Sequence, residues 1–174
     1  MYEGIDEESE NESKYNIGEC DLVIQTLKEL LSLGIQRSDI GVITPYNAQV
    51  NLIKKQIRHS EDLLIQTPAG GSKTSKNIEV CTVDGFQGRE KEVIIISMVR
   101  SNPSHEIGFL SNERRMNVAV TRAKRLCVLI GDTGTVSKNA FLKNLVEYFK
   151  ANAGVIRSAF DYQDNPDVRI MYGQ

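Results

Sequence analysis

The sequence predicts an α/β protein built on a mostly parallel sheet that is flanked by helices. Short apolar runs rich in β-branched residues alternate with segments whose apolar residues recur at helical spacing. The run from Val93 to Val99 is almost continuously apolar, which is typical of a strand buried on both faces of a parallel sheet. At 174 residues with 40% apolar composition, the chain is long enough for one such domain with a sizeable core.

The elements can be placed from the apolar pattern and from the residues that begin or end helices. Leucine and valine recur on one face of the segment 18–33, and Gly34 follows where a helix would end. Pro45 separates a buried strand at 40–44 from a helix at 47–59. The later elements are expected as strands at 78–83, 93–99 and 125–130, a helix at 113–124, a helix capped by Ser137 or Asn139, and an uncertain fifth strand near 155–160.

Charge is distributed unevenly along the chain. Residues 1–12 carry six carboxylates and no lysine or arginine, so we expect 1–16 to be an acidic, flexible lead-in. The formal net charge is −2, and without those twelve residues it becomes +4. A mildly basic domain at 17–163 permits contact with nucleic acid without requiring it. We expect residues 164–174 to be a weakly specified polar tail.

Cysteine and histidine offer no metal chemistry. Cys20, Cys81 and Cys127 are odd in number and widely spaced, and the two histidines lack ligand spacing, so zinc and a disulfide framework are not expected. No run of 18 apolar residues and no signal peptide is present. We therefore expect an intracellular monomer without membrane contact, in the nucleus, the cytoplasm or both.

A polar loop between two β-rich runs is the strongest candidate for a functional site. Gly85 and Gly88 let the backbone turn sharply and approach a ligand. Gln87, Arg89 and Glu90 add an amide, a permanent cation and a carboxylate within four residues. Loops at the carboxyl ends of parallel strands commonly hold ligands in α/β proteins. The alternative is a solvated connection whose charges are incidental.

Three stretches, in order, resemble helicase motifs. They are ITPYNAQ at 43–49, DGFQGREKEVIIISMVRSN at 84–102 and RRMNVAVTRAK at 114–124. They are similar to motifs IV, V and VI in the second RecA-like domain of superfamily 1B, or up-frameshift-like, helicases, and most similar to the immunoglobulin-mu-binding-protein subgroup. The resemblance runs from about 13 to 163. It implies a RecA-like three-layer fold, single-stranded DNA or RNA as partner, and 5′-to-3′ movement.

The parts that hold ATP phosphates are not found in this sequence. A phosphate-binding loop ending at Lys73-Thr74 would need glycine at 67 and 72, where the chain has Thr67 and Ser72. We therefore expect a flexible surface loop there. No Asp-Glu pair follows an apolar strand. The resemblance then implies that ATP and Mg²⁺ are held largely by a first RecA-like domain and that this chain alone is inactive. The alternative is a non-catalytic module that binds nucleic acid or protein.

The resemblance also implies roles for individual residues. Arg122 is expected to be the catalytic arginine finger, and Arg115 either supports it or pairs with an acid. The expected nucleotide contacts are Tyr46 stacking on adenine, Gln49 beside it, and Gly88, Arg89 and Glu90, with Glu90 accepting from a ribose hydroxyl.

Each nucleotide contact has a plainer alternative. Arg122 could be an ordinary surface arginine, Tyr46 a core residue, and Glu90 half of a salt bridge. Up-frameshift relatives carry arginine where this chain has Val50, which puts a second phosphate contact in doubt.

Polar residues at two strand ends are candidates for the nucleic-acid track. Hydroxyls, amides and backbone N–H groups aimed at phosphates bind nucleic acid without reading bases. The resemblance to helicases implies contacts with the strand from Thr82, Val83, Asp84, Ser97, Arg100, Ser101, Asn102 and Asn117.

Overall fold

The computed structural model describes residues 5–9, 12–60, 63, 77–152, 155–156 and 168–173. Their main sheet has six strands in the order β4-β3-β5-β6-β8-β7. The first four of these pair in parallel, whereas β8 is antiparallel to both β6 and β7. The predicted mostly parallel sheet is therefore confirmed. The strands are β4 Glu79–Thr82, β3 Ile40–Thr44, β5 Lys91–Ser97, β6 Ala123–Asp132, β8 Val168–Gly173 and β7 Val155–Ile156.

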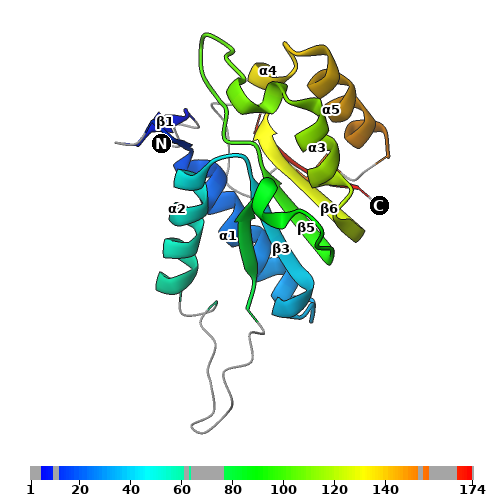
Figure 1. The fold of residues 1–174 in the computed structure, drawn as a ribbon. Helices are drawn as coiled ribbons and strands as arrows, with labels where there is room; N and C mark the ends of the chain where they lie inside the picture. The colour runs from blue at the N-terminus through cyan, green and yellow to red at the C-terminus, as the bar shows by residue number, and fades with distance from the viewer. Residues whose placement is uncertain are drawn as a thin grey trace, which may run out of the picture.

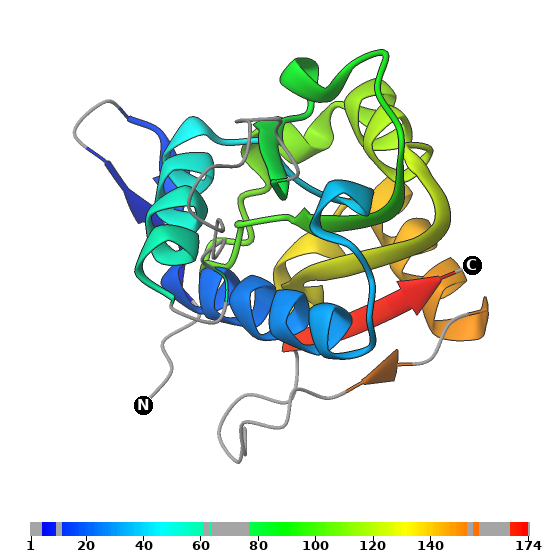
Figure 2. The ribbon, with the colours of Figure 1, turned by 90° about the horizontal axis from the view of Figure 1, so that it is seen from below.

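Helices cover both faces of the sheet, which gives three layers (Figures 1 and 2). One apolar cluster joins the sheet to α1 and α2, and a second joins it to α3, α4 and α5. Strand β5 supplies both clusters, because Val93 and Ile95 face the first while Ile94 and Ile96 face the second. The helices are α1 Ile17–Ser32, α2 Asn47–His59, α3 Glu113–Val120, α4 Thr133–Val136 and α5 Ala140–Asn152.

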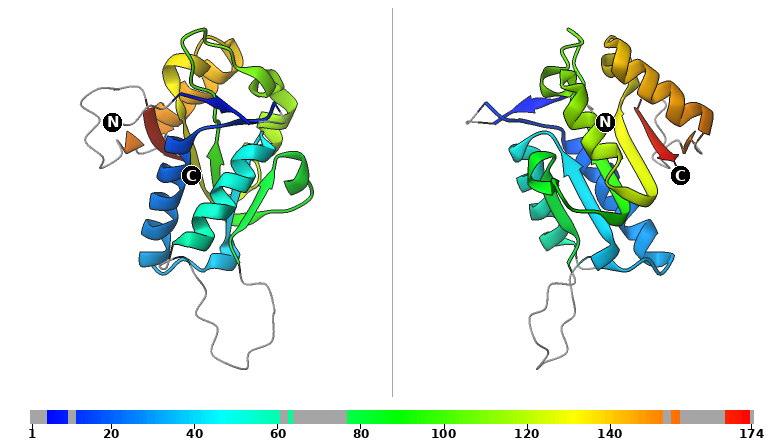
Figure 3. Two further views of the ribbon diagram at one scale, coloured as in Figure 1. Left: turned by 90° about the vertical axis from the view of Figure 1, so that its left-hand side faces the viewer. Right: turned by 45° about the vertical axis from the view of Figure 1, so that its right-hand side comes forward.

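The N-terminal segment is structured where the structure describes it, so the prediction of a flexible lead-in is wrong for those residues. Strands β1 (Glu7–Glu8) and β2 (Lys14–Tyr15) form a separate antiparallel ribbon that projects from the body (Figure 3). Asp6, just before β1, donates its backbone N–H to the carbonyl of Ser101 at 2.7 Å. The partner is 95 residues away, so a local charge pattern could not reveal it.

The predicted helix at 113–124 is four residues too long. Helix α3 ends at Val120, and Ala123 already pairs with Lys91 as the first residue of β6. Ala123, Lys124 and Arg125 favour helices by propensity, but pairing with β5 overrides that preference. Arg122 consequently lies in the turn between α3 and β6 and not on the helix.

Other predicted segments have mixed outcomes. The 164–174 tail contains β8, so the prediction of a weakly specified tail is wrong at 168–173. Of the uncertain strand near 155–160, only β7 is described. The loop around Lys73-Thr74 lies outside the described residues. No helix in the described ranges is long and apolar enough to span a membrane.

Candidate functional site

The loop between β4 and β5 holds several candidate residues. It runs from the edge of the sheet where the parallel strands end, the carboxyl edge, to the edge where they begin, the amino edge. Strand β4 pairs with β3, while β5 lies on the far side of β3, so residues 83–90 must cross over β3. A single turn, η3 (Asp84–Phe86), makes this crossing, and the fully buried ring of Phe86 anchors it in the core. Asp84 therefore starts at the carboxyl edge of the sheet, and Gly88–Glu90 arrive at the amino edge.

Arg122 and Glu90 are neighbours at the amino edge. The N–H of Lys91 donates to the carbonyl of Arg122 at 3.2 Å, so the residues before β5 and β6 lie side by side. Within the described ranges, the Arg122 guanidinium is held by two neutral acceptors, the Val118 carbonyl at 3.1 Å and the Thr121 hydroxyl at 3.3 Å. Among the residues that the structure describes, the exposed Glu90 carboxylate has no hydrogen-bond or ion-pair partner. The Arg122 guanidinium can therefore exchange neutral partners for a ligand, and the Glu90 carboxylate is available to accept a hydrogen bond from one.

Gly88 and Arg89 shape this end of the loop. Gly88 has φ +77° with open space around it, so glycine is required by the backbone conformation and not by crowding. The exposed Arg89 guanidinium forms an ion pair with Glu79 of β4, and Lys91 also reaches Glu79 at 3.5 Å. A phosphate contact by Arg89 would require it to leave Glu79.

At the other end of the loop, Asp84 holds Arg115 of α3. Their ion pair measures 2.9 Å, with 42% of the Arg115 side chain and 64% of the Asp84 side chain exposed. Arg115 therefore pairs with an acid, the second of its two predicted roles. A nucleic-acid contact by Asp84 itself is disfavoured, because a carboxylate repels phosphate.

Tyr46 and Gln49 are more deeply placed than the sequence suggested. Tyr46 is 4% exposed, and its ring packs against the ring of Phe109, with centroids 5.4 Å apart. This packing leaves no face of Tyr46 open for adenine. Gln49 is fully buried, and its amide binds the backbone of Asn16 and the hydroxyl of Ser97. Gln49 therefore joins α2 to α1 and β5 and cannot face a nucleotide here.

Ser97 belongs to a buried polar network that fixes the end of β5. Its hydroxyl donates to the Glu19 carboxylate at 2.7 Å, and the same Glu19 oxygen accepts from the N–H of Val99 at 2.8 Å. Val99 has φ +73°, an unusual conformation for a β-branched residue. Asn16 donates to the Val99 carbonyl, so both polar groups of this strained residue are held. Ser97 is fully buried, and the prediction that it contacts nucleic acid is wrong for this structure.

Arg100, Ser101 and Asn102 surround the carboxylate of Asp6. The same Asp6 oxygen lies 2.9 Å from the Arg100 Nε, the Ser101 N–H and the Asn102 amide nitrogen. Arg100 is 5% and Ser101 6% exposed, so neither presents its side chain to a phosphate backbone in this structure. Ser101 also donates to Asp132, and Asn102 accepts from the Glu106 N–H. Their predicted track contacts are replaced by internal partners.

The remaining predicted track residues have different surroundings. Val83 is 4% exposed, and the half-buried Thr82 accepts from the N–H of Gly85. Asn117 is exposed on α3, and its carbonyl accepts from the Thr121 hydroxyl at 2.8 Å. Of these three, only Asn117 offers its side chain to a ligand.

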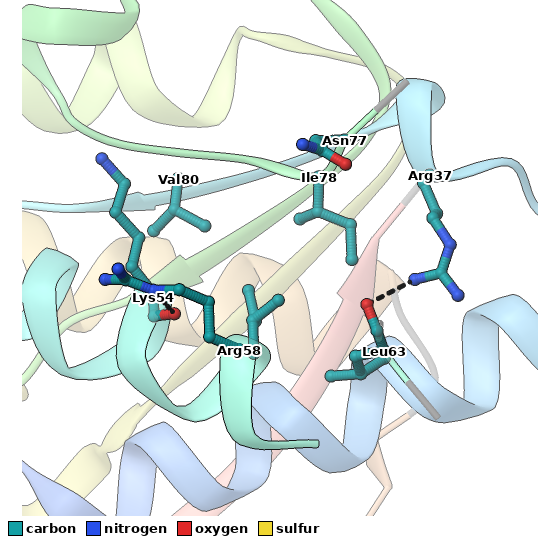
Figure 4. A pocket seen from close by; sticks show the side chains of 8 residues that line it. Arg37, Lys54, Arg58, Leu63, Asn77, Ile78 and Val80 are labelled. Atoms are coloured by element: carbon teal, nitrogen blue, oxygen red, sulfur yellow. Dashed lines mark hydrogen bonds between the residues drawn. The ribbon is translucent and has the colours of Figure 1, made fainter. Parts of the chain in front are cut away.

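A separate cavity of about 450 Å³ lies between α2 and β4 (Figure 4). Its wall includes the cations Arg37, Lys54 and Arg58 together with apolar residues, and Arg37 donates to the Leu63 carbonyl at 3.0 Å. No residue predicted from the motifs lines it. This cavity is therefore not the site that the motifs indicate.

Mg²⁺ does not fit the described part of this chain. Within the described ranges, no group of three or more His, Cys, Asp or Glu residues could hold a metal ion. The fit to a nucleotide rests on Arg122, whose present partners are neutral, and on the unpaired Glu90. The guanidinium matches a phosphate in charge, and the carboxylate can accept a hydrogen bond from a ribose hydroxyl.

Sequence reasoning missed three residues that organise the site. Asp6 falls in the predicted lead-in, Glu19 in the predicted helix at 18–33, and Phe109 between the predicted strand at 93–99 and the predicted helix at 113–124. Glu19 carried one usable signal, since a carboxylate in a first helical turn suits the helix dipole. Asp6 and Phe109 gave none, because Asp6 contacts Ser101 and Phe109 packs on Tyr46, each pair far apart in sequence.

Comparison with known proteins agrees with the motif assignment. The AAA domain family matches residues 2–134. DNA-binding protein SMUBP-2 of Rattus norvegicus is 45% identical over 91% of this chain and 15% of its own length. DNA polymerase alpha-associated DNA helicase A of Saccharomyces cerevisiae is 46% identical over 82% of this chain and 20% of its own. Regulator of nonsense transcripts 1 of Dictyostelium discoideum is 36% identical over 95% of this chain and 12% of its own.

Each of these relatives is several times longer than the region matched. The chain spans between 12% and 20% of their lengths. A solved phosphoethanolamine N-methyltransferase 2 of Haemonchus contortus is 14% identical over 88% of this chain and 36% of that chain, with a TM-score of 0.46, a likeness too low to indicate function. Because the family match covers most of the sequence, the chain belongs to the AAA domain family of superfamily 1B helicases.

Proposed function

We propose that this chain is the second RecA-like domain of an ATP-dependent helicase that moves 5′ to 3′ on single-stranded DNA or RNA. The observation that carries the proposal is the juxtaposition of Arg122 and Glu90 at the starts of two paired parallel strands. Relatives named as helicases and as a DNA-binding protein support the assignment. The partner required is a first RecA-like domain that holds the ATP phosphates and Mg²⁺.

In this proposal Arg122 acts as the arginine finger. Bound ATP supplies a phosphoryl group whose negative charge is redistributed in the transition state. The guanidinium now bonds a carbonyl and a hydroxyl, so moving to phosphate oxygens replaces neutral acceptors with charged ones. The turn between α3 and β6 keeps the backbone of Arg122 fixed while its side chain moves.

Glu90 has the complementary role of holding the sugar. Its exposed carboxylate accepts from a ribose hydroxyl and makes no demand on the base. Gly88 permits the backbone turn that brings Glu90 beside Arg122. The Arg89–Glu79 ion pair ties this loop to β4, which limits its movement. In this proposal the residue that binds the sugar, Glu90, precedes β5, and the residue that stabilises charge at the phosphate, Arg122, precedes β6.

The test is steady-state ATP hydrolysis by a full-length parent helicase carrying Arg122→Ala. We expect kcat to fall by roughly 10³-fold or more, with a much smaller change in KM, because a finger acts on the transition state. Arg114→Ala is the matched control, since Arg114 is exposed on α3 two turns away and removes the same charge. Unchanged kcat in Arg122→Ala would refute the finger and favour a non-catalytic module.

A further inference from the structure

We propose that the exposed ring of Phe109 is a platform on which a nucleobase stacks. This inference rests on the proposed function and adds a residue that the motifs do not indicate. Phe109 is 57% exposed, one of few large apolar side chains in the described residues that face solvent. It lies in η4 (Gly108–Ser111), the turn just before α3. A single exposed aromatic residue is ordinary, so the argument depends on what supports the ring.

The ring is supported from below by motif IV. The buried ring of Tyr46 lies against it at 45°, and the Tyr46 hydroxyl accepts from the Phe109 N–H at 3.3 Å. Tyr46 thus fixes both the backbone and the side chain of Phe109. Tyr46 cannot stack on a base itself while buried, but it makes the neighbouring ring rigid. A rigid ring loses little conformational entropy when a flat ligand covers it.

Motifs V and VI place a cation over the Phe109 ring. The Arg115 guanidinium carbon lies 6.0 Å from the centre of the Phe109 ring, within the range of a cation–π contact. Arg115 is in turn held by Asp84 of the β4–β5 loop. An aromatic face with an adjacent guanidinium matches a nucleotide, because the base stacks while the cation attracts phosphate.

Gly108 keeps the ring in this position. It has φ +51°, and a Cβ there would lie 2.6 Å from the Tyr46 hydroxyl and 2.9 Å from Arg100. The turn is therefore pressed onto buried residues at the position before the ring. At the other end, Asn112 caps α3 by accepting from the Arg115 N–H. The chain thus has a fixed backbone on both sides of Phe109, and the ring faces solvent.

The ligand chemistry is a nucleobase, which can come from ATP or from the nucleic-acid strand. Contact with Tyr46, the motif IV residue expected near adenine, favours ATP. A single reporter can separate the two sources, because the chain contains no tryptophan. The Phe109→Trp variant places the only indole at the platform, where stacking quenches its emission. Leu33→Trp is the matched control, since Leu33 is 78% exposed at the end of α1 in the opposite layer.

The experiment titrates both variants of this chain with four ligands and checks folding by circular dichroism. The ligands are ATP, inorganic tripolyphosphate, a short single-stranded oligonucleotide and an abasic oligomer of equal length. We expect ATP to quench Phe109→Trp emission at least twofold at saturation, while tripolyphosphate and Leu33→Trp show little change. Quenching by the oligonucleotide but not by its abasic form would assign the platform to the strand instead.

Several results would overturn the proposal. Equal quenching by ligands with and without bases would show that charge, not stacking, is sensed. No quenching by any ligand up to millimolar concentration would show that bases do not reach the ring. In a second measurement, Phe109→Leu should weaken binding of the quenching ligand several-fold, whereas Phe109→Tyr should retain it. If Phe109→Leu does not weaken binding while Arg122→Ala still lowers kcat in the full-length parent, the platform is refuted and the proposed function stands.

Discussion

Glu19→Gln provides the sharpest test of how the carboxyl edge of the sheet is held together. Glu19 is 1% exposed, and burial raises the pKa of its carboxyl to about 8, with Asp132 and Asp6 adding to the rise. Bonds from Ser97 and Val99 oppose this change in pKa only partly. One oxygen of Glu19 has no hydrogen-bond partner among the described residues. The folded protein therefore prefers the neutral acid.

The sign of the pH effect follows from this preference. In the unfolded chain the carboxyl has its ordinary pKa of 4.5, so between pH 4.5 and 8 the folded state binds the extra proton. Stability is then fully present below pH 4.5 and falls as the pH rises toward 8. A pKa difference of this size corresponds to roughly 5 kcal/mol, and relaxation around the buried charge lowers the expected loss to roughly 2–5 kcal/mol.

The assay is urea denaturation of wild type and Glu19→Gln at pH 5 and pH 9. Glutamine cannot ionise, so the difference in unfolding free energy between the two proteins isolates Glu19 from other titrating groups. The variant should gain about 2–5 kcal/mol relative to wild type between the two pH values. At pH 5 alone it can be less stable, because a buried amide needs partners that an acid does not. A constant difference across this range would refute the buried neutral acid.

The remaining predictions concern the N-terminal segment and the turn before Phe109. Asp6→Ala should lower the unfolding free energy by about 2–4 kcal/mol in urea, because it leaves the buried Arg100 without its closest carboxylate; an unchanged midpoint would mean that residues 5–9 do not pack as described. Gly108→Ala should cost about 2–3 kcal/mol, from left-handed strain and a clash with Tyr46. Gly88→Ala, which has the same strain in open space, should cost only about 1 kcal/mol.

The strands could be predicted from the sequence because each buried strand is a short run of apolar residues. Strand β3 is buried throughout, and the last five residues of β5 are buried as well. Such runs report burial directly, and burial decides the strand positions. The end of α3 could not be predicted, because Ala123 and the residues after it suit a helix and become a strand only through pairing with β5.

Whether a polar candidate residue is buried or available to a ligand depends on contacts with distant segments, which the sequence does not reveal. Ser97 and Arg122 both follow motif patterns, yet Ser97 is buried against Glu19 while Arg122 meets only neutral acceptors. A hydroxyl at a strand end serves a ligand or an internal network equally well. Its role is decided by whether a distant segment, here the N-terminus of α1, covers it. Phe109 shows the converse case, since its proposed role rests on contacts with Tyr46, 63 residues away, and with Arg115 of the following helix.

Helix α3 joins the two ends of the candidate site into one rigid unit. Its eight residues span about 12 Å. Arg115 in the first turn contacts the Phe109 ring, and Arg122 lies two residues beyond the last turn. Asn112 caps the start of the helix, and Thr121 closes its end by bonding the Asn117 carbonyl. A ligand that fixed Phe109 would therefore also fix the origin of the Arg122 side chain, so the proposed base binding and the proposed phosphate contact would be geometrically coupled through this one short helix.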